Sequence, residues 1–128
     1  MSKQTALAFV DAINAHDVEK ILSLMTEDHL FIDTYGDRQT KVQMETGWPG
    51  YFEWFPDYHI EVAEVLQTDN TVALFGYASG TYKGVPAPDR KNYWRLPAAW
   101  RVVAQSGKVK VWQVFADSKI PYDCMKTE

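Results

Sequence analysis

The stretch GWPGYFEWFPDYHIEV, residues 47–62, contains the two signals that decide the fold. Its first twelve positions hold two tryptophans, two phenylalanines and two tyrosines. Four of these rings fall at intervals of three or four residues: Trp48, Tyr51, Phe52 and Phe55. A helix would place most of them on one face. From Tyr58 the pattern changes to the period of two that is typical of a strand, so the stretch predicts an aromatic helix leading directly into a sheet.

Shorter helical patterns precede this stretch. Leu7, Val10 and Ile13 recur at helical spacing near the N-terminus. Asp17 then stands before a second apolar stripe within residues 18–25. Its carboxylate can accept hydrogen bonds from the exposed amides of the next turn, so we expect Asp17 to cap a second helix.

The segment between these helices and the aromatic stretch predicts one strand and the start of the third helix. The sequence HLFIDT, residues 29–34, has the composition of a short strand. Residues 39–54 then favour a helix, with Pro49 and Gly50 marking a break or a kink within it.

The rest of the chain is predominantly β. Val65 is out of phase with the alternation that begins at Tyr58, which predicts a β-bulge near Ala63 and Glu64. Three further strands are predicted over residues 71–82, 92–104 and 108–116. Pro97 lies within the second of these and predicts a bulge or a sheet edge at that point.

The composition limits the class of protein. A chain of 128 residues predicts a single domain spanning residues 1–128. The net charge is −4, with no basic cluster, so we expect no nucleic-acid partner. Apolar runs are too short for a signal peptide or a membrane span, so we expect no membrane partner and a cytoplasmic protein. Cys124 is the only cysteine, which excludes an internal disulfide.

Helices followed by a long meander of strands predict an α+β fold. Four segments occur in the order typical of one family: FVDAINAHDVEKILSLMTEDHLFID, FPDYHIEV, GTYKG and WRVVAQSGKVKVWQVFAD. The chain resembles SnoaL-like proteins, of the superfamily of ketosteroid isomerases, polyketide cyclases and nuclear transport factor 2, over about residues 5–120. The resemblance implies a cone in which a curved antiparallel sheet wraps around N-terminal helices and leaves an apolar pocket at its open end.

The resemblance also implies that the third helix lines this pocket, and a small hydrophobic ligand is therefore expected. The residues expected to contact it are Phe9, Phe31, Trp48, Tyr51, Phe52, Phe55, Trp94, Trp100 and Trp112. The alternative is that these rings only fill the core between helix and sheet.

Asp33 is the first candidate for catalysis. It shares a strand face with Phe31, so an aromatic neighbour would remove water from the carboxylate and favour a general base. The resemblance places it where ketosteroid isomerases carry their proton-shuttling aspartate. The alternative is that Asp33 caps the turn at Thr34-Tyr35-Gly36.

Asp117 is the second candidate. Polyketide cyclases of this family carry an acid–base aspartate in the last strand, and the resemblance places Asp117 near it. However, Ala116 occupies the matching strand face, because Asp117 follows Trp112 by five residues instead of four. Asp117 could equally cap the turn at residues 118–120.

Two departures from the isomerase pattern are visible. Phe9 occupies the position of the isomerase tyrosine and Ala98 that of the protonated aspartic acid, so neither oxyanion donor is present. Steroid isomerisation is therefore not expected. Two functions remain open: cofactor-free proton transfer of the isomerase or cyclase type with Asp33 as base, and a non-catalytic ligand-binding or scaffold module.

We also expect a homodimer. Similar proteins mostly associate through the outer face of the sheet, and the last strand is apolar on both faces near its end, at Trp112, Val114 and Phe115. No metal is expected, because His29 and His59 are predicted to begin strands and point outward.

Overall fold

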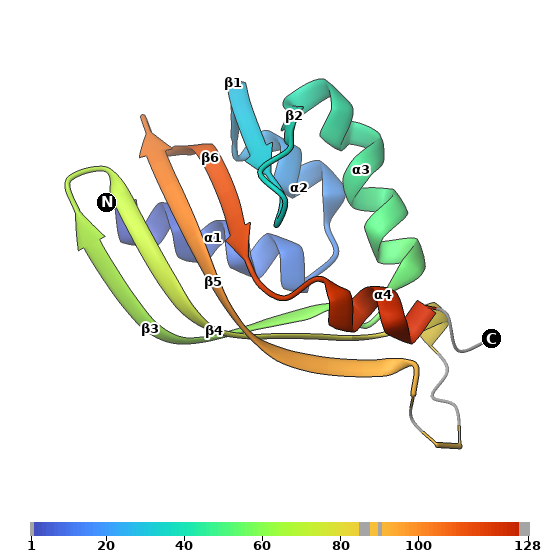
Figure 1. Ribbon diagram of the computed structural model, residues 1–128. Coiled ribbons are helices and arrows are strands. Elements are labelled where there is room, and N and C mark those ends of the chain that lie inside the picture. The colour runs from blue at the N-terminus through green and yellow to red at the C-terminus, as the bar shows by residue number, and fades with distance from the viewer. Residues whose placement is uncertain (1, 85–87, 90, 126–128) are drawn as a thin grey trace.

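A curved six-stranded sheet forms the framework, and the computed structural model describes residues 2–84, 88–89 and 91–125. The helices and strands follow in this order: α1 (Ser2–Asn14), α2 (Val18–Ser23), β1 (Met25–Ile32), β2 (Arg38–Thr40), α3 (Lys41–Trp54), β3 (His59–Thr68), β4 (Thr71–Thr81), the short 3₁₀ helix η1 (Tyr82–Gly84), β5 (Tyr93–Gln105), β6 (Lys108–Phe115) and α4 (Lys119–Met125). Figure 1 shows α1 lying along one face of the sheet, with α3 beside β1 and β2.

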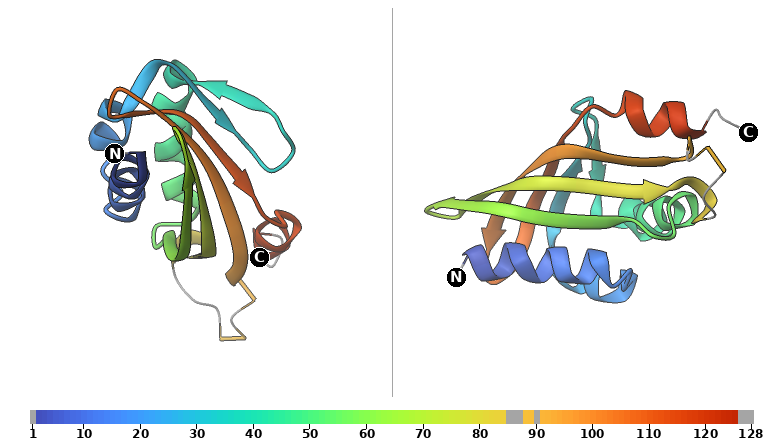
Figure 2. Two further views of the ribbon diagram at one scale, coloured as in Figure 1. Left: turned by 90° about the vertical axis from the view of Figure 1, so that its left-hand side faces the viewer. Right: turned by 90° about the horizontal axis from the view of Figure 1, so that it is seen from below.

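The strands are ordered β2-β1-β6-β5-β4-β3, and the sheet bends without closing into a barrel (Figure 2). The predicted α+β fold, a curved sheet around N-terminal helices, is confirmed. One pairing differs from the predicted antiparallel sheet: β1 and β6 run parallel. The reason is that the chain leaves β1, builds α3 and the meander β3–β6, and returns beside β1 in the same direction.

Helix caps fix where α2 and α3 begin. The Asp17 carboxylate accepts a hydrogen bond from the amide of Lys20 at 3.1 Å, which confirms the predicted N-cap. Thr40 caps α3, with its hydroxyl accepting from the Gln43 amide and the Gln43 side chain accepting from the Thr40 amide. The predicted helix start at residue 39 was wrong, because residues 38–40 pair with β1 as β2.

The predicted bulge in β3 is confirmed, and it bends the long hairpin of β3 and β4. The pairing register shifts between Val62 and Glu64, so Ala63 is the extra residue. Gly76 lies opposite, where an added Cβ atom would come within 1.9 Å of the Glu61 carbonyl oxygen. Only glycine allows β4 to approach the bulged strand this closely.

The side chains of strand β5 alternate between the inner and the outer face of the sheet. Its residues alternate between buried and more exposed positions over most of its length, with Trp94 and Trp100 inward and Arg95 and Arg101 outward, as predicted. Pro97 lies at a local edge of the sheet, which is one of the two predicted possibilities. It pairs with Tyr77 of β4, but β6 ends at Phe115, opposite Ala99, and so leaves the other side of β5 unpaired at Pro97.

Other boundaries differ from the sequence expectations. Strand β1 ends at Ile32, so Asp33 follows the strand instead of lying in it. The predicted turn at residues 118–120 is the beginning of α4. His29 is not outward-facing: it is 1% exposed, and its Nδ1 lies 2.7 Å from the Val109 carbonyl oxygen in the parallel strand. Among the described residues, no helix combines the length and the apolar character needed to cross a membrane.

Candidate ligand-binding cavity

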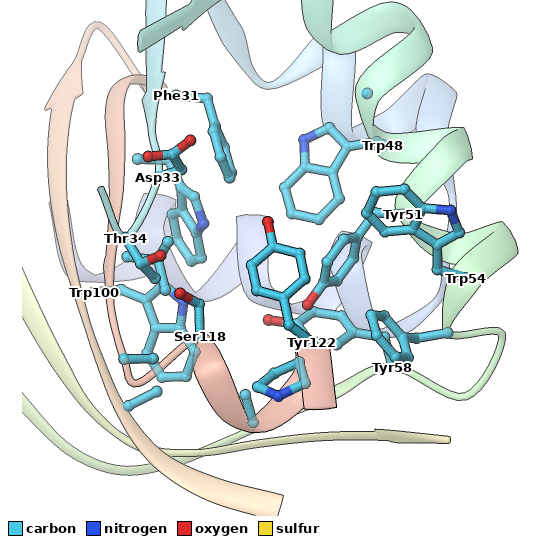
Figure 3. Close-up of a pocket in the computed structure, with 18 of the residues that line it drawn as sticks. Phe31, Asp33, Thr34, Trp48, Tyr51, Trp54, Tyr58, Trp100, Ser118 and Tyr122 are labelled. Carbon is cyan, nitrogen blue, oxygen red and sulfur yellow. The ribbon is translucent and has the colours of Figure 1, made fainter. Parts of the chain in front are cut away.

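A cavity of about 470 Å³ lies between α3, α4 and the inner face of the sheet. Most of the aromatic residues expected to contact a ligand line it: Phe31, Trp48, Tyr51, Phe55, Trp94, Trp100 and Trp112. Small side chains of the strands, Ala78 and Ala98 among them, form its floor. Figure 3 shows the rings of α3 on one side of the cavity and Asp33 on the other.

The aromatic residues of α3 hold one another in place by edge-to-face contacts. Tyr51 meets Phe55 with ring centroids 5.2 Å apart, and Phe55 meets Trp94 of β5 at 5.4 Å and 84°. Gly80 permits this packing, because a Cβ atom there would lie 3.1 Å from Phe55 Cβ. Since edge-to-face pairs have a defined geometry, this side of the cavity is a preformed surface.

Two of the expected contact residues lie outside the cavity lining. Phe9, on the buried face of α1, is fully buried, with its ring centroid 4.9 Å from that of Trp112. Phe52 stacks on the His16 ring at 4.1 Å and 6°. For these two rings the structure agrees with the alternative of core filling: the face of α3 that carries Phe52 turns toward the α1–α2 connection.

Asp33 lines the cavity and also caps its own turn. Its Oδ1 accepts hydrogen bonds from the amides of Tyr35 at 2.9 Å and Asp37 at 3.0 Å. No described residue donates a hydrogen bond to Oδ2. The side chain is half-buried, and Figure 3 shows it beside Phe31. Asp33 therefore makes the turn-capping contacts of the alternative interpretation, and it does so from a position in the cavity lining.

Asp117 also belongs to the cavity lining, in the connection from β6 to α4. It is exposed, and its Oδ1 accepts a hydrogen bond from the Lys119 amide at 3.1 Å. Asp117 therefore combines a place in the lining with the turn-capping contact of the alternative interpretation. Ala116, on the matching strand face, lines the cavity as well.

Two tyrosines in the lining were not predicted as site residues. Tyr58 follows α3 and is 7% exposed, and burial raises its pKa above the ordinary value. Tyr122 comes from α4, beyond the segments that carry the family resemblance. The sequence contained a signal only for Tyr58, which ends the run of aromatic residues in the opening stretch.

Three buried nitrogen atoms lack hydrogen-bond partners among the described residues: His29 Nε2, Trp48 Nε1 and Trp94 Nε1. Burial lowers the pKa of His29, so its imidazole is neutral. The described part of the chain contains no cluster of three or more histidine, cysteine, aspartate or glutamate residues able to hold a metal ion.

A curved sheet over N-terminal helices with an aromatic cavity defines the nuclear transport factor 2-like class of α+β folds. Residues 6–112 match the family model of the SnoaL-like domain, and the chain belongs to this family. No match was found among curated proteins.

Solved structures of the same fold include proteins with cyclase and isomerase-like names. IdmH from Streptomyces antibioticus, named as a candidate polyketide cyclase, is 19% identical with a TM-score of 0.80, over 98% of each chain. A protein with a ketosteroid isomerase-like fold from Catenulispora acidiphila, in complex with trimethylamine, is 14% identical with a TM-score of 0.78, over 94% of this chain and 92% of that one. A cystatin-fold protein from Novosphingobium aromaticivorans is 21% identical with a TM-score of 0.75, over 89% of this chain and 97% of that one. At these identities the likeness establishes the fold alone.

Proposed function

We propose that the protein binds a small, largely apolar molecule in the cavity between α3, α4 and the sheet. The observation that carries the proposal is the cavity itself, at about 470 Å³ and lined mainly by aromatic and aliphatic side chains. This volume lies in the range of small-molecule sites, about 300–1,000 Å³. The few polar groups at one end would orient the ligand, while the rings would supply most of the contact area.

The test is to obstruct the cavity from its floor. Ala98 lines the cavity on β5 and is 8% exposed, so the ring of Ala98→Phe would project into the space for the ligand. Ala15→Phe adds the same ring at an exposed position between α1 and α2 and is the matched control. Fluorene, a flat apolar probe, is titrated while tryptophan fluorescence is followed. We expect Ala98→Phe to weaken binding at least tenfold and Ala15→Phe to leave it unchanged; equal binding by both variants would contradict the proposal.

Proton transfer is a second candidate function, with Asp33 as a cofactor-free general base of the isomerase or cyclase type. The specific observation in its favour is that Asp33 lines the cavity while its Oδ2 accepts no hydrogen bond from the described residues. Asp117 is a second carboxylate in the cavity lining. The cyclase name of a structural neighbour supports this reaction class by analogy only. The alternative is binding without catalysis.

We also propose a homodimer formed through the outer face of the sheet. Phe75, Ala99 and Phe115 are aligned across β4, β5 and β6, and the two phenylalanines are 41% and 50% exposed. An exposed apolar row across three strands is typical of an interface. Phe115→Glu is expected to shift the sedimenting species from twice 14.7 kDa to 14.7 kDa. Val42→Glu, at a 73% exposed position on α3, should remain dimeric; a wild-type monomer at micromolar concentration would refute the dimer.

A further inference from the structure

The cavity lining carries charge of one sign only. Among the described residues that line it, Asp33 and Asp117 are carboxylates and none is a lysine, an arginine or a histidine. Because β1 and β6 are parallel neighbours, their ends point the same way; Asp33 follows the end of β1 and Asp117 follows that of β6. A cleft lined by one sign of charge attracts ligands of the opposite sign. The lining therefore favours a cationic ligand over an anionic one.

No described residue neutralises either carboxylate by an ion pair. Both side chains accept hydrogen bonds through Oδ1 from backbone amides of their own turns. Lys119 donates its amide to Asp117, but its ammonium group lies 2.7 Å from Asp123 Oδ2, outside the lining. Asp33 is half-buried, so its charge is screened less than that of an exposed group, and its Oδ2 accepts no hydrogen bond from the described residues. This oxygen can pair with a cation on the ligand.

Aromatic rings surround the more buried of the two carboxylates. Figure 3 shows Phe31 beside Asp33, and the Phe31 ring meets that of Trp48 edge to face, with centroids 5.7 Å apart and an angle of 86°. Trp48 in turn meets Tyr51 at 6.4 Å and 89°. Rings at right angles present their faces in different directions, and each face attracts a cation. Proteins recognise quaternary ammonium groups with sets of rings of this kind.

We propose that the ligand of the cavity is an apolar amine, a molecule with a hydrophobic body and a tertiary or quaternary ammonium group. This inference rests on the proposed binding function and adds the charge that the ligand carries. The ammonium group lies beside Asp33 and against the faces of Phe31 and Trp48, while the hydrophobic body fills the rest of the cavity. N-alkyl groups suit this site, because a compact primary ammonium is strongly hydrated and costs more to bring out of water.

A matched pair of probes tests this inference. Benzyltrimethylammonium and neopentylbenzene have the same shape and differ in a charged nitrogen against a neutral carbon atom. The affinity of each is measured by tryptophan fluorescence for the wild-type chain and for Asp33→Asn, Asp117→Asn and Phe31→Leu. Glu53→Gln is the control, because it removes an exposed carboxylate of α3 that lies outside the cavity lining.

We expect the wild-type chain to bind the ammonium probe about tenfold more tightly than its neutral counterpart. Asp33→Asn should weaken ammonium binding about fivefold, and the more exposed Asp117 should contribute about twofold. Phe31→Leu keeps an apolar side chain without a π face and should cost about threefold. None of these variants should alter the affinity for neopentylbenzene, which also shows that they remain folded. The preference for the ammonium probe should shrink as the salt concentration rises.

The failure of this inference is distinguishable from the failure of the binding function. Equal or tighter binding of neopentylbenzene by the wild-type chain would overturn the amine class and leave the binding function standing. A preference for the ammonium probe that persists in Asp33→Asn, or that falls as much in Glu53→Gln, would overturn the site assigned to the cation. Fluorene binding without any binding of benzyltrimethylammonium would overturn the amine class alone. Absence of binding by all three probes would overturn both.

Discussion

Different interactions hold the side chains on the two sides of the cavity in place. The α3 side is held by aromatic contacts such as that between Phe55 and Trp94, and its rings are fixed by packing from several elements. The side at the ends of β1 and β6 carries Asp33 and Asp117, and both carboxylates accept hydrogen bonds from the backbone of their own turns. The aromatic side is therefore part of the hydrophobic core, whereas the polar side is held only by hydrogen bonds within local turns. Mutations should affect stability on the first side far more than on the second.

The largest expected effect is on the aromatic side. Phe55 is 1% exposed, between Tyr51 and Trp94, so Phe55→Ala should destabilise the protein by about 3–5 kcal/mol through lost burial and an enlarged cavity. The neighbouring Trp54, the last residue of α3, is 46% exposed, and Trp54→Ala should cost no more than about 1 kcal/mol. Urea unfolding measures both values. If both variants lost the same free energy of unfolding, burial in the aromatic packing would not explain the stability contributed by Phe55.

The next effect concerns alkaline pH. The pKa values of Tyr51 and Tyr58 are raised in the folded protein, so above pH 10 the unfolded chain loses these protons first and stability falls as pH rises. Each tyrosine should contribute a loss of about 1 kcal/mol between pH 10 and pH 11. Tyr58→Phe should remove its share of this loss, as measured by urea unfolding at both pH values. If the free energy of unfolding of Tyr58→Phe fell by the same amount as that of the wild-type chain, the pKa of Tyr58 would not be raised in the folded protein.

The smallest effect is expected at Asp33. Asp33→Ala removes the acceptor for the amides of Tyr35 and Asp37 and should cost about 1 kcal/mol. Asp33→Asn retains an acceptor oxygen and should change stability by less than about 0.5 kcal/mol. If Asp33 transfers a proton, the asparagine variant would also lose orders of magnitude in rate on a substrate. Full activity in that variant would exclude the general base.

The sequence predicted the aromatic side better than the polar side. Spacing along α3 identified Trp48, Tyr51 and Phe55, because the helical period directly determines which rings share a face. The same spacing wrongly included Phe52 among the cavity residues. Phe52 instead stacks on His16, and that contact depends on where the α1–α2 connection lies in the fold. The bulge at Ala63 could be predicted from the sequence, because one extra residue shifts the phase of the alternating pattern of apolar residues.

Tertiary contacts explain what the sequence did not reveal. Tyr122 joins the cavity only because α4 folds back against β5 and the end of the sheet. His29 is buried because β6 returns parallel to β1 and offers the Val109 carbonyl to its ring. Neither pairing has a local pattern, since both join segments that are far apart in the chain.

The central claim, that the cavity holds a small apolar ligand, is tested most directly by a crystal structure of the protein grown with fluorene. We expect electron density for the probe between Trp48, Tyr51 and Trp94. A cavity closed by the repacked rings of α3, or a probe bound only elsewhere on the surface, would contradict the claim.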